Sequence, residues 1–205
     1  MRGAYDRTTI DAILDEGFIC HVGFVHDDGY PVVLPTIYAR SGDTVYFHGS
    51  QGSRMLRTAA AEPQVCLTVT LVDGIVLARS AFHSSMNYRS VVVFGKARRV
   101  EDPKEREAAL EAVVEHVAPG RWAETRWPNP KELQATSVLA LSLDEASAKI
   151  RTGPPVDDDE DYALPYWAGV IPLAVQAGQP ETDPHQNGVA IPGYVLEYRR
   201  ASTPR

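Results

Sequence analysis

Apolar and polar residues alternate along most of the first 150 positions, as in strands that bury one face. Residues 18–26 and 31–40 alternate on either side of the turn residues Asp28-Gly29, which predicts a hairpin. Further strands are predicted at residues 44–48, 64–72, 75–82, 88–100, 137–143 and 147–151. In this pattern Asp73-Gly74 is a hairpin turn, and Gly95 marks a bulge or the corner of a barrel. The pattern therefore indicates an antiparallel sheet.

Few segments carry helix signals. The predicted helices are a short one capped by Thr8 or Thr9 and ended by Gly17, one over residues 54–61, one begun by Asp102-Pro103 with Glu105, and one begun by Asn129-Pro130. These strand segments with so few helices predict a mainly β chain closed into a barrel of six or seven antiparallel strands, because closure removes exposed edges.

The composition changes after residue 153. Residues 154–205 hold 8 of the 15 prolines, together with the acidic run DDDED from Asp157. We therefore expect a barrel domain at residues 1–153 and an irregular tail at residues 154–205. The apolar piece LPYWAGVIPL at residues 164–173 is expected to lie across the barrel or a partner subunit.

Charge and cysteine content exclude several classes of protein. The formal net charge of -7, without a dense basic cluster, disfavours binding to nucleic acid or to an anionic membrane. No stretch approaches the roughly 18 to 20 apolar residues that span a bilayer, and the N-terminus does not resemble a secretory signal. Cys20 and Cys66 lie in apolar runs, which predicts buried thiols, a cytoplasmic protein and no metal site.

The segment YFHGSQGSRMLR, residues 46–57, joins a predicted strand to a predicted helix. Its small residues expose backbone N–H groups and the hydroxyls of Ser50 and Ser53, and Arg54 and Arg57 add positive charge. This arrangement suits an anion such as a phosphate. The alternative is that Ser53 only caps the helix and the glycines only turn the chain.

A second group of polar residues lies in the segment SMNYRSV, residues 85–91, at the start of a predicted strand. Asn87, Tyr88, Arg89 and Ser90 could line a cofactor cleft, with Tyr88 stacking and Arg89 reaching an anion, or they could satisfy only their own backbone.

Histidines supply a third set of candidates. His48 and His83 flank the expected cleft, and neither belongs to a catalytic triad or a zinc motif.

The motifs YDRTTIDAILDE, GYPVVLPTIYARSGDTVYFHGSQGSRMLR, VCLTVTLVDGIVLARSAFHSSMNYRSVVVFGKARRV, SAKIRTGPPVDDDED and WAGVIPL occur in this order over nearly the whole chain. Together they resemble the pyridoxamine 5'-phosphate oxidase-related split-barrel proteins, in the branch of the nitroimidazole-resistance reductases. The resemblance implies an FMN-binding, split β-barrel of Greek-key type and a cleft between the two subunits of a homodimer.

The resemblance also implies where the cofactor lies. Its phosphate would bind Ser50, Ser53 and Arg54, and the strand carrying Pro35, Thr36 and Ile37 would run beside the isoalloxazine ring. Proline offers no N–H, so Thr36 and its neighbours would make the bonds to the ring.

In this family AFHHSMNYRSV is common, whereas this chain has Ser84 in place of the second histidine.

The expected function is that of an FMN-dependent oxidoreductase. It would carry electrons from NAD(P)H to a small electrophilic substrate, and His48 would position that substrate or donate a proton. The alternative is a protein that binds haem, or flavin with haem, through His48 or His83. FAD and a deazaflavin are the other cofactors that such a barrel would accommodate.

We expect Arg54→Ala to weaken FMN binding by about tenfold or more and riboflavin binding far less. Only FMN has the phosphate, and a charge-assisted hydrogen bond to it is worth roughly 1.5 to 3 kcal/mol. Fluorescence titration of both ligands measures the difference, and equal losses would refute a phosphate contact.

Overall fold

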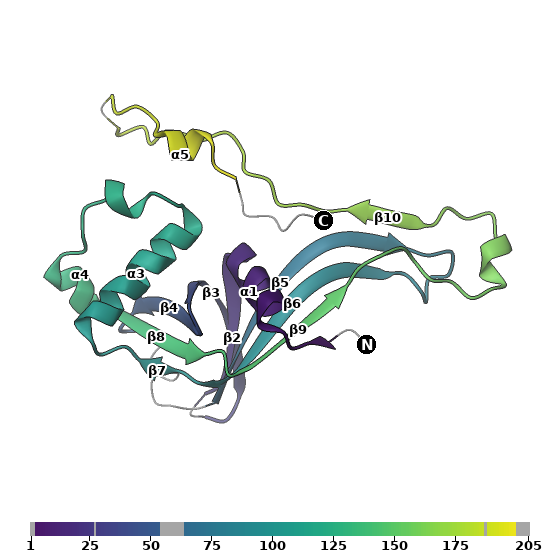
Figure 1. Cartoon of the computed structure of the whole chain (residues 1–205), viewed down its shortest axis with the longest axis horizontal. Coiled ribbons are helices and arrows are strands. Elements are labelled where there is room, and N and C mark those ends of the chain that lie inside the picture. The colour runs from purple at the N-terminus through teal and green to yellow at the C-terminus, as the bar shows by residue number, and fades with distance from the viewer. Residues whose placement is uncertain (1–2, 27, 54–63, 187, 200–205) are drawn as a thin grey trace.

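The computed structural model describes residues 3–26, 28–53, 64–186 and 188–199. Figure 1 shows a barrel-like body at one end and a long arm of strands at the other. The body contains β2 (Ile19–Val25), β3 (Pro31–Ser41), β4 (Thr44–Ser50) and β8 (Thr136–Ser142). The arm is built by the extensions of β5 (Gln64–Leu77) and β6 (Ser85–Lys96), with β9 (Glu145–Arg151) beside β6.

All strand pairs are antiparallel, and their order is β1-β9-β6-β5-β2-β3-β4-β8-β7, with β10 paired to β5. The predicted mainly β, antiparallel split-barrel fold is confirmed. The described residues form ten strands instead of six or seven. Three of them, β1 (Gly3–Ala4), β7 (Arg98–Arg99) and β10 (Gly169–Pro172), are too short to show an alternating pattern. Hydrogen bonding does not close the order into a ring over the part described.

The hairpin predicted at Asp73-Gly74 is wrong. β5 runs straight through these residues, and its register with β6 shifts by one residue between Val72 and Gly74, as at a bulge. Glycine is required because a Cβ on Gly74 would lie 3.0 Å from Val170 Cγ1 and 3.1 Å from the Ile171 carbonyl oxygen. The Asp73-Gly74 pair, which has the sequence of a turn, is therefore the place where β10 lies against β5.

The long strand predicted at residues 88–100 is divided into β6 and β7. β6 pairs with β5 and β9, whereas β7 pairs with β8 on the other side of the body. The corner falls at Ala97, two residues after Gly95, and the pairing of Val65 with Gly95 is regular. The corner therefore lies two residues beyond the predicted position, and the bulge lies elsewhere.

Helix α1 (Arg7–Glu16) begins one turn earlier than predicted. Asp6 is its cap, because its carboxylate accepts a 2.8 Å hydrogen bond from the Thr9 backbone N–H. The start of α3 (Pro103–Val117) agrees with the prediction, since Asp102 accepts from the Glu105 N–H at 2.8 Å.

The remaining helices are short. Asn129 and Glu132 form a full capping box at α4 (Pro130–Ala135), and α5 (Gly193–Leu196) lies in the C-terminal tail. The helix expected over residues 54–61 lies outside the described residues.

The main core joins α1 to the inner faces of the strands. Ile10, Ile13 and Leu14 of α1 pack with strand residues such as Leu67 and Phe47, all of them at most 2% exposed. This burial excludes apolar surface from water and is the main source of stability.

The end of α1 approaches the sheet closely. The Tyr38 hydroxyl donates a 2.6 Å hydrogen bond to the Leu14 carbonyl oxygen. A Cβ on Gly17 would lie 2.6 Å from both Tyr38 Oη and Val69 Cγ1. Only glycine fits there, so Gly17 fixes how closely α1 packs on the barrel.

A smaller apolar cluster lies on the outer face of β4 and β8, beneath α3. It contains Val100, Ala109, Val138 and Ala140. Since successive residues of a strand point to opposite faces, Phe47 is buried in the main core while His48, paired with Val138, points outward.

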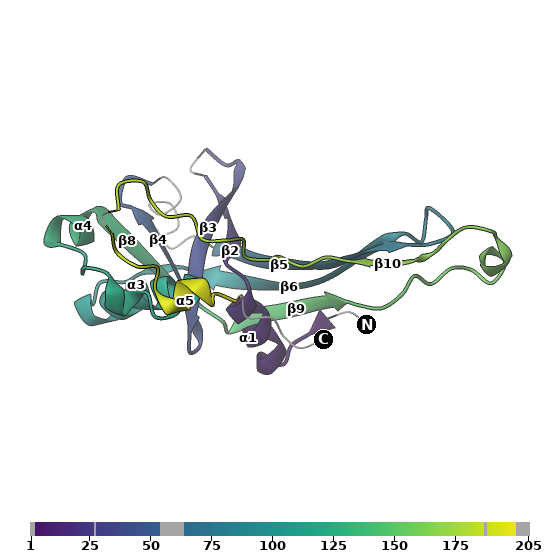
Figure 2. The same ribbon diagram turned by 90° about the horizontal axis from the view of Figure 1, so that it is seen from above.

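The tail is not wholly irregular. Its residues Gly169–Pro172 form β10, so the apolar WAGVIPL segment lies along the edge of β5. Beyond β10 the chain runs back over the sheet toward the body, where α5 lies (Figures 1 and 2). None of the described helices is long and apolar enough to cross a membrane.

Candidate functional site

A groove of about 1360 Å³ lies between the arm and the returning C-terminal tail. Leu71, Asp73, Asn87 and Arg89 line it on the sheet side, and residues 172–180 line it on the other. The groove therefore exists only because a strand of the tail pairs with β5 and the chain then turns back over the sheet.

A charged junction lies in this groove. The Arg89 guanidinium donates to the Asp73 carboxylate at 2.7 and 2.9 Å and to both carboxylate oxygens of Glu16, at 2.9 Å for Oε1. Hydrogen bonds from Arg89 to Asp73 and Glu16 raise the pKa of Arg89 above its usual value. An anionic ligand would reach Arg89 only by displacing one of these carboxylates.

Neither carboxylate belongs to the set of residues selected from the sequence. Asp73 reads as part of a turn, and Glu16 as the end of an amphipathic helix. One signal in the sequence could have identified Asp73. It is an aspartate within the run LTVTLVDGIVL, which is rich in apolar and β-branched residues, and a charge buried in such a strand needs a partner.

The four polar residues of the β6 start divide between two faces. Asn87 and Arg89 line the groove. Asn87 is 8% exposed, donates to the Gly153 carbonyl oxygen at 3.0 Å and accepts from Arg151 at 2.5 Å. Tyr88 and Ser90 point to the other face, where both contact Lys149. The structure therefore does not gather all four residues in one cleft.

The strand predicted to run beside the flavin ring is solvent-exposed. Pro35 and Ile37 of β3 lie opposite His21 and Ile19 of β2 on the outer side of the sheet. Thr36 alternates with them, and its hydroxyl bonds to the Ile37 carbonyl oxygen at 3.4 Å.

An apolar surface continues across this side of the body. We call it the outer apolar face and define it by residues that are 41–62% exposed: Ile19, Val25, Val33, Ile37 and Phe94. The register places Val33, Gly23, Cys66 and Phe94 in one row across four strands. Such a contiguous patch is typical of a surface that a ligand or another protein chain covers.

In the segment after β4, the backbone N–H groups of residues 51–53 already form hydrogen bonds within the protein. Gln51 N–H donates to the Ala135 carbonyl oxygen, Ser53 N–H to the Ser50 carbonyl oxygen, and Gly52 N–H to the Ser50 hydroxyl. An anion here would therefore depend on side chains more than on these amides. Arg54 and Arg57 lie outside the described residues, so the phosphate site stays a prediction.

His48 has an uncommitted ring nitrogen. Its Nδ1 is buried and has no hydrogen-bond partner among the described residues. Burial lowers the pKa of His48 below its usual value, so the ring is neutral at pH 7. A neutral imidazole with a free nitrogen is suited to accept a hydrogen bond or to ligate a metal, and less suited to donate a proton.

His83, by contrast, has a polar partner. Its Nε2 lies 3.2 Å from the Asp158 carboxylate, in the loop between β5 and β6 at the end of the arm. Ser84, which replaces the second histidine of the family motif, closes that loop by accepting from the Ala78 N–H at 3.1 Å. Here Ser84 therefore has a local structural role.

The comparisons with known proteins agree with this architecture. A family model described as pyridoxamine 5'-phosphate oxidase matches residues 6–150. The chain therefore belongs to the pyridoxamine 5'-phosphate oxidase-like, flavin-binding family. No curated protein sequence matches it significantly.

Two solved structures resemble the chain over almost its whole length. The flavocytochrome Anf3 of Azotobacter vinelandii is 44% identical, with 97% of this chain and 92% of that one covered and a TM-score of 0.91. An FAD and haem binding protein of Mycobacterium smegmatis is 39% identical, with 96% and 97% covered and a TM-score of 0.91.

A third structure is more distant. It is a 5-nitroimidazole antibiotic resistance protein of Bacteroides thetaiotaomicron, 23% identical, with 72% of this chain and 86% of that one covered and a TM-score of 0.61. It supports the shared fold.

We expect Arg89→Gln to lower the free energy of unfolding by roughly 2 kcal/mol, because Glu16 and Asp73 would keep partly buried charges without a counterion. Their remaining exposure of 12% and 21% keeps the loss below that of a fully buried pair. Urea unfolding measures it. Arg99→Gln is the control, because its partner Glu101 is 81% exposed and the pair contributes little. Equal losses in both variants would contradict a structural role for the junction.

Proposed function

We propose that this protein binds both a flavin and haem and transfers electrons between them or to a small acceptor. The two relatives that match nearly the whole chain at 44% and 39% identity are a flavocytochrome and an FAD and haem binding protein. This likeness includes the tail, which the family model does not reach. It favours the flavin-plus-haem alternative over a flavin enzyme alone.

The structural observation that best supports haem binding is that His48 Nδ1 has no hydrogen-bond partner among the described residues. Iron is ligated by neutral imidazole, which is the form that burial favours here. Four of the other histidines have polar partners: His26 with Asp28, His83 with Asp158, His116 with the Gly17 carbonyl oxygen, and His185 with Asp183. His21 lies on the exposed surface of β2. His48 is therefore our first candidate for an axial ligand.

The flavin is proposed to lie along the outer side of β3. Pro35 and Ile37 would flank the ring from the exposed face, Thr36 would bond to it, and the Ser50 and Ser53 hydroxyls with Arg54 would hold the phosphate. On β6, Tyr88 and Ser90 stay candidates for this site, whereas Asn87 and Arg89 face the groove on the opposite side of the sheet. The bound flavin would supply the redox chemistry, and the protein would orient it and limit access to it.

Among flavins, the relative from Mycobacterium smegmatis, an FAD and haem binding protein, favours FAD. FMN and a deazaflavin are the alternatives. We propose reduced nicotinamide as the electron donor and a small electrophile as the acceptor. In this scheme His48 acts as a ligand rather than as a proton donor, because its pKa is lowered.

We expect the purified protein to show flavin absorption bands and, after addition of haemin, a shifted Soret band of one haem per chain. His48→Ala should abolish the shift and leave the flavin content unchanged, because the variant removes an iron ligand and not a flavin contact. Mass spectrometry of the released cofactor distinguishes FAD from FMN and deazaflavin.

His185→Ala is the control for this experiment, since His185 is exposed and paired with Asp183. A His48 variant that binds haemin as the wild type does would remove His48 from the proposal. A wild-type protein without any Soret shift would remove haem altogether.

We further propose that two copies associate through the outer apolar face. Exposed valine and isoleucine side chains on neighbouring strands form a surface suited to a partner of the same kind, and two-fold pairing is the commonest arrangement. The flavin would then be enclosed between the two subunits.

We expect Val33→Lys to yield a folded monomer, because the new charge would be buried at the interface of a dimer but is harmless on a 62% exposed site. Light scattering should give a mass near 22.5 kDa for this variant and twice that for the wild type. Val189→Lys, at a tail position that is 66% exposed, should stay dimeric. A monomeric wild type with flavin bound would contradict the proposal.

A further inference from the structure

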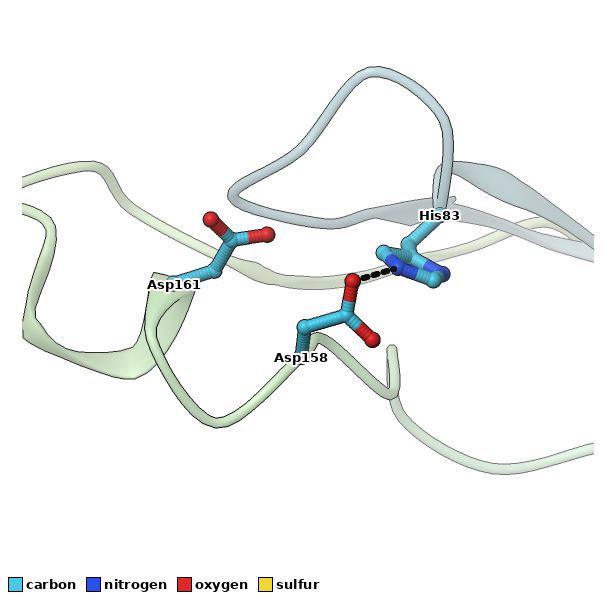
Figure 3. Close-up of side chains that lie close together, drawn as sticks. All are labelled: His83, Asp158 and Asp161. Atoms are coloured by element: carbon cyan, nitrogen blue, oxygen red, sulfur yellow. Dashed lines mark hydrogen bonds and ion pairs between the residues drawn. The ribbon is translucent and has the colours of Figure 1, made fainter.

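Three side chains with metal-ligating atoms meet at the far end of the arm. They are His83 from the loop between β5 and β6, and Asp158 and Asp161 from the start of the tail. One ligand atom of each lies within 4.8 Å of those of the other two. Figure 3 shows the Asp158 carboxylate between the His83 ring and Asp161. Two segments about 75 residues apart in sequence thus supply one donor set.

The charges at this place are unbalanced. Asp161 has no ion pair among the described residues, and Asp158 has only His83. Arg79 is engaged elsewhere, because its Nη1 bonds to Asp157 at 3.1 Å and its guanidinium carbon lies 5.1 Å from the centre of the Tyr162 ring. Two carboxylates this close repel each other unless a cation lies between them.

The two segments are held in place independently of the three ligands. Asp157, 6% exposed, accepts hydrogen bonds from the backbone N–H groups of Arg79 at 2.9 Å and Ser80 at 3.2 Å. These bonds fix the residue before Asp158 against the loop that carries His83. Asp157 therefore anchors this part of the tail to the loop between β5 and β6.

We propose that His83, Asp158 and Asp161 bind a divalent transition-metal ion of the zinc class. One imidazole nitrogen with two carboxylate oxygens is a donor set that such ions accept, whereas magnesium and calcium prefer oxygen alone. Three protein ligands leave a position for water. The ion bridges the loop between β5 and β6 to the segment that leads into β10.

A bound ion at this place would affect the groove that the tail encloses. The tail beyond this point forms β10 and then one side of the groove over Arg89. A bound ion adds a second attachment of the tail to the arm, about eight residues before β10 begins, in addition to the hydrogen bonds of β10 itself. It thereby stabilises the tail in the position that encloses the groove.

The sequence contains no sign of this site. Its ligand spacing matches no zinc motif, since His83 is far from the two aspartates and the acidic run reads as a solvated tail. The expectation that the chain has no metal site rested on that spacing and on the two cysteines in apolar runs.

The test is a zinc titration of the full-length protein as purified, after removal of weakly bound metals with a chelator. Competition with a coloured zinc chelator should show one zinc ion per chain for the wild type. Asp161→Asn and His83→Ala should each weaken binding by at least about tenfold, because each removes a ligand. Cobalt in place of zinc should give visible absorption bands that both variants lose.

His185→Ala is the matched control. His185 and Asp183 form an exposed pair at 3.1 Å, like His83 and Asp158, but have no third donor nearby among the described residues. This variant should bind zinc as the wild type does. Circular dichroism should show that all variants are folded.

Three results would overturn the proposal: no zinc binding by the wild type, undiminished binding by Asp161→Asn and His83→Ala, or an equal loss in His185→Ala. Loss of haem or flavin absorption in His83→Ala without loss of zinc would also overturn it, by assigning His83 to the cofactor. The outcome is independent of the haem experiment on His48, which uses a different residue and a different ligand.

Discussion

The ionic junction of Arg89 with Glu16 and Asp73 is the contact on which the arrangement of the molecule depends. Arg89 lies on β6, Glu16 ends α1 and Asp73 occupies the bulge of β5. One guanidinium group thus joins the helix that fills the body to the two strands that form the arm. The bulge next to it brings Gly74 under β10. Body, arm and tail therefore meet at this junction.

The two faces of the barrel have different roles. The inner face buries α1 and carries the stability of the fold. The outer face keeps apolar side chains exposed on β2 and β3 and a neutral histidine partly buried on β4. Flavins and haem are flat and largely apolar, so a sheet surface with a few polar groups suits both. This division is consistent with the proposal that the cofactors bind outside the core, on the outer side of the sheet.

The tail links these features to the groove. It is attached along β5 by β10 and anchored at the end of the arm by Asp157, which bonds to the backbone of Arg79 and Ser80. From there it returns over the sheet and encloses the charged junction. Access to the groove therefore depends on how firmly the tail is attached, and the proposed metal ion would act on that property.

The sequence by itself determined the local elements. Alternation predicted β2, β3 and β4, and the caps at Asp102 and Asn129 predicted α3 and α4, because these signals depend on neighbours a few residues away. It could not show that Asp73-Gly74 continues a strand, since the reason is Arg89 on β6 and a strand of the tail. Likewise, the burial of His48 Nδ1 without a partner among the described residues, and the meeting of His83 with Asp158 and Asp161, arise from contacts between distant segments, which only the tertiary structure decides.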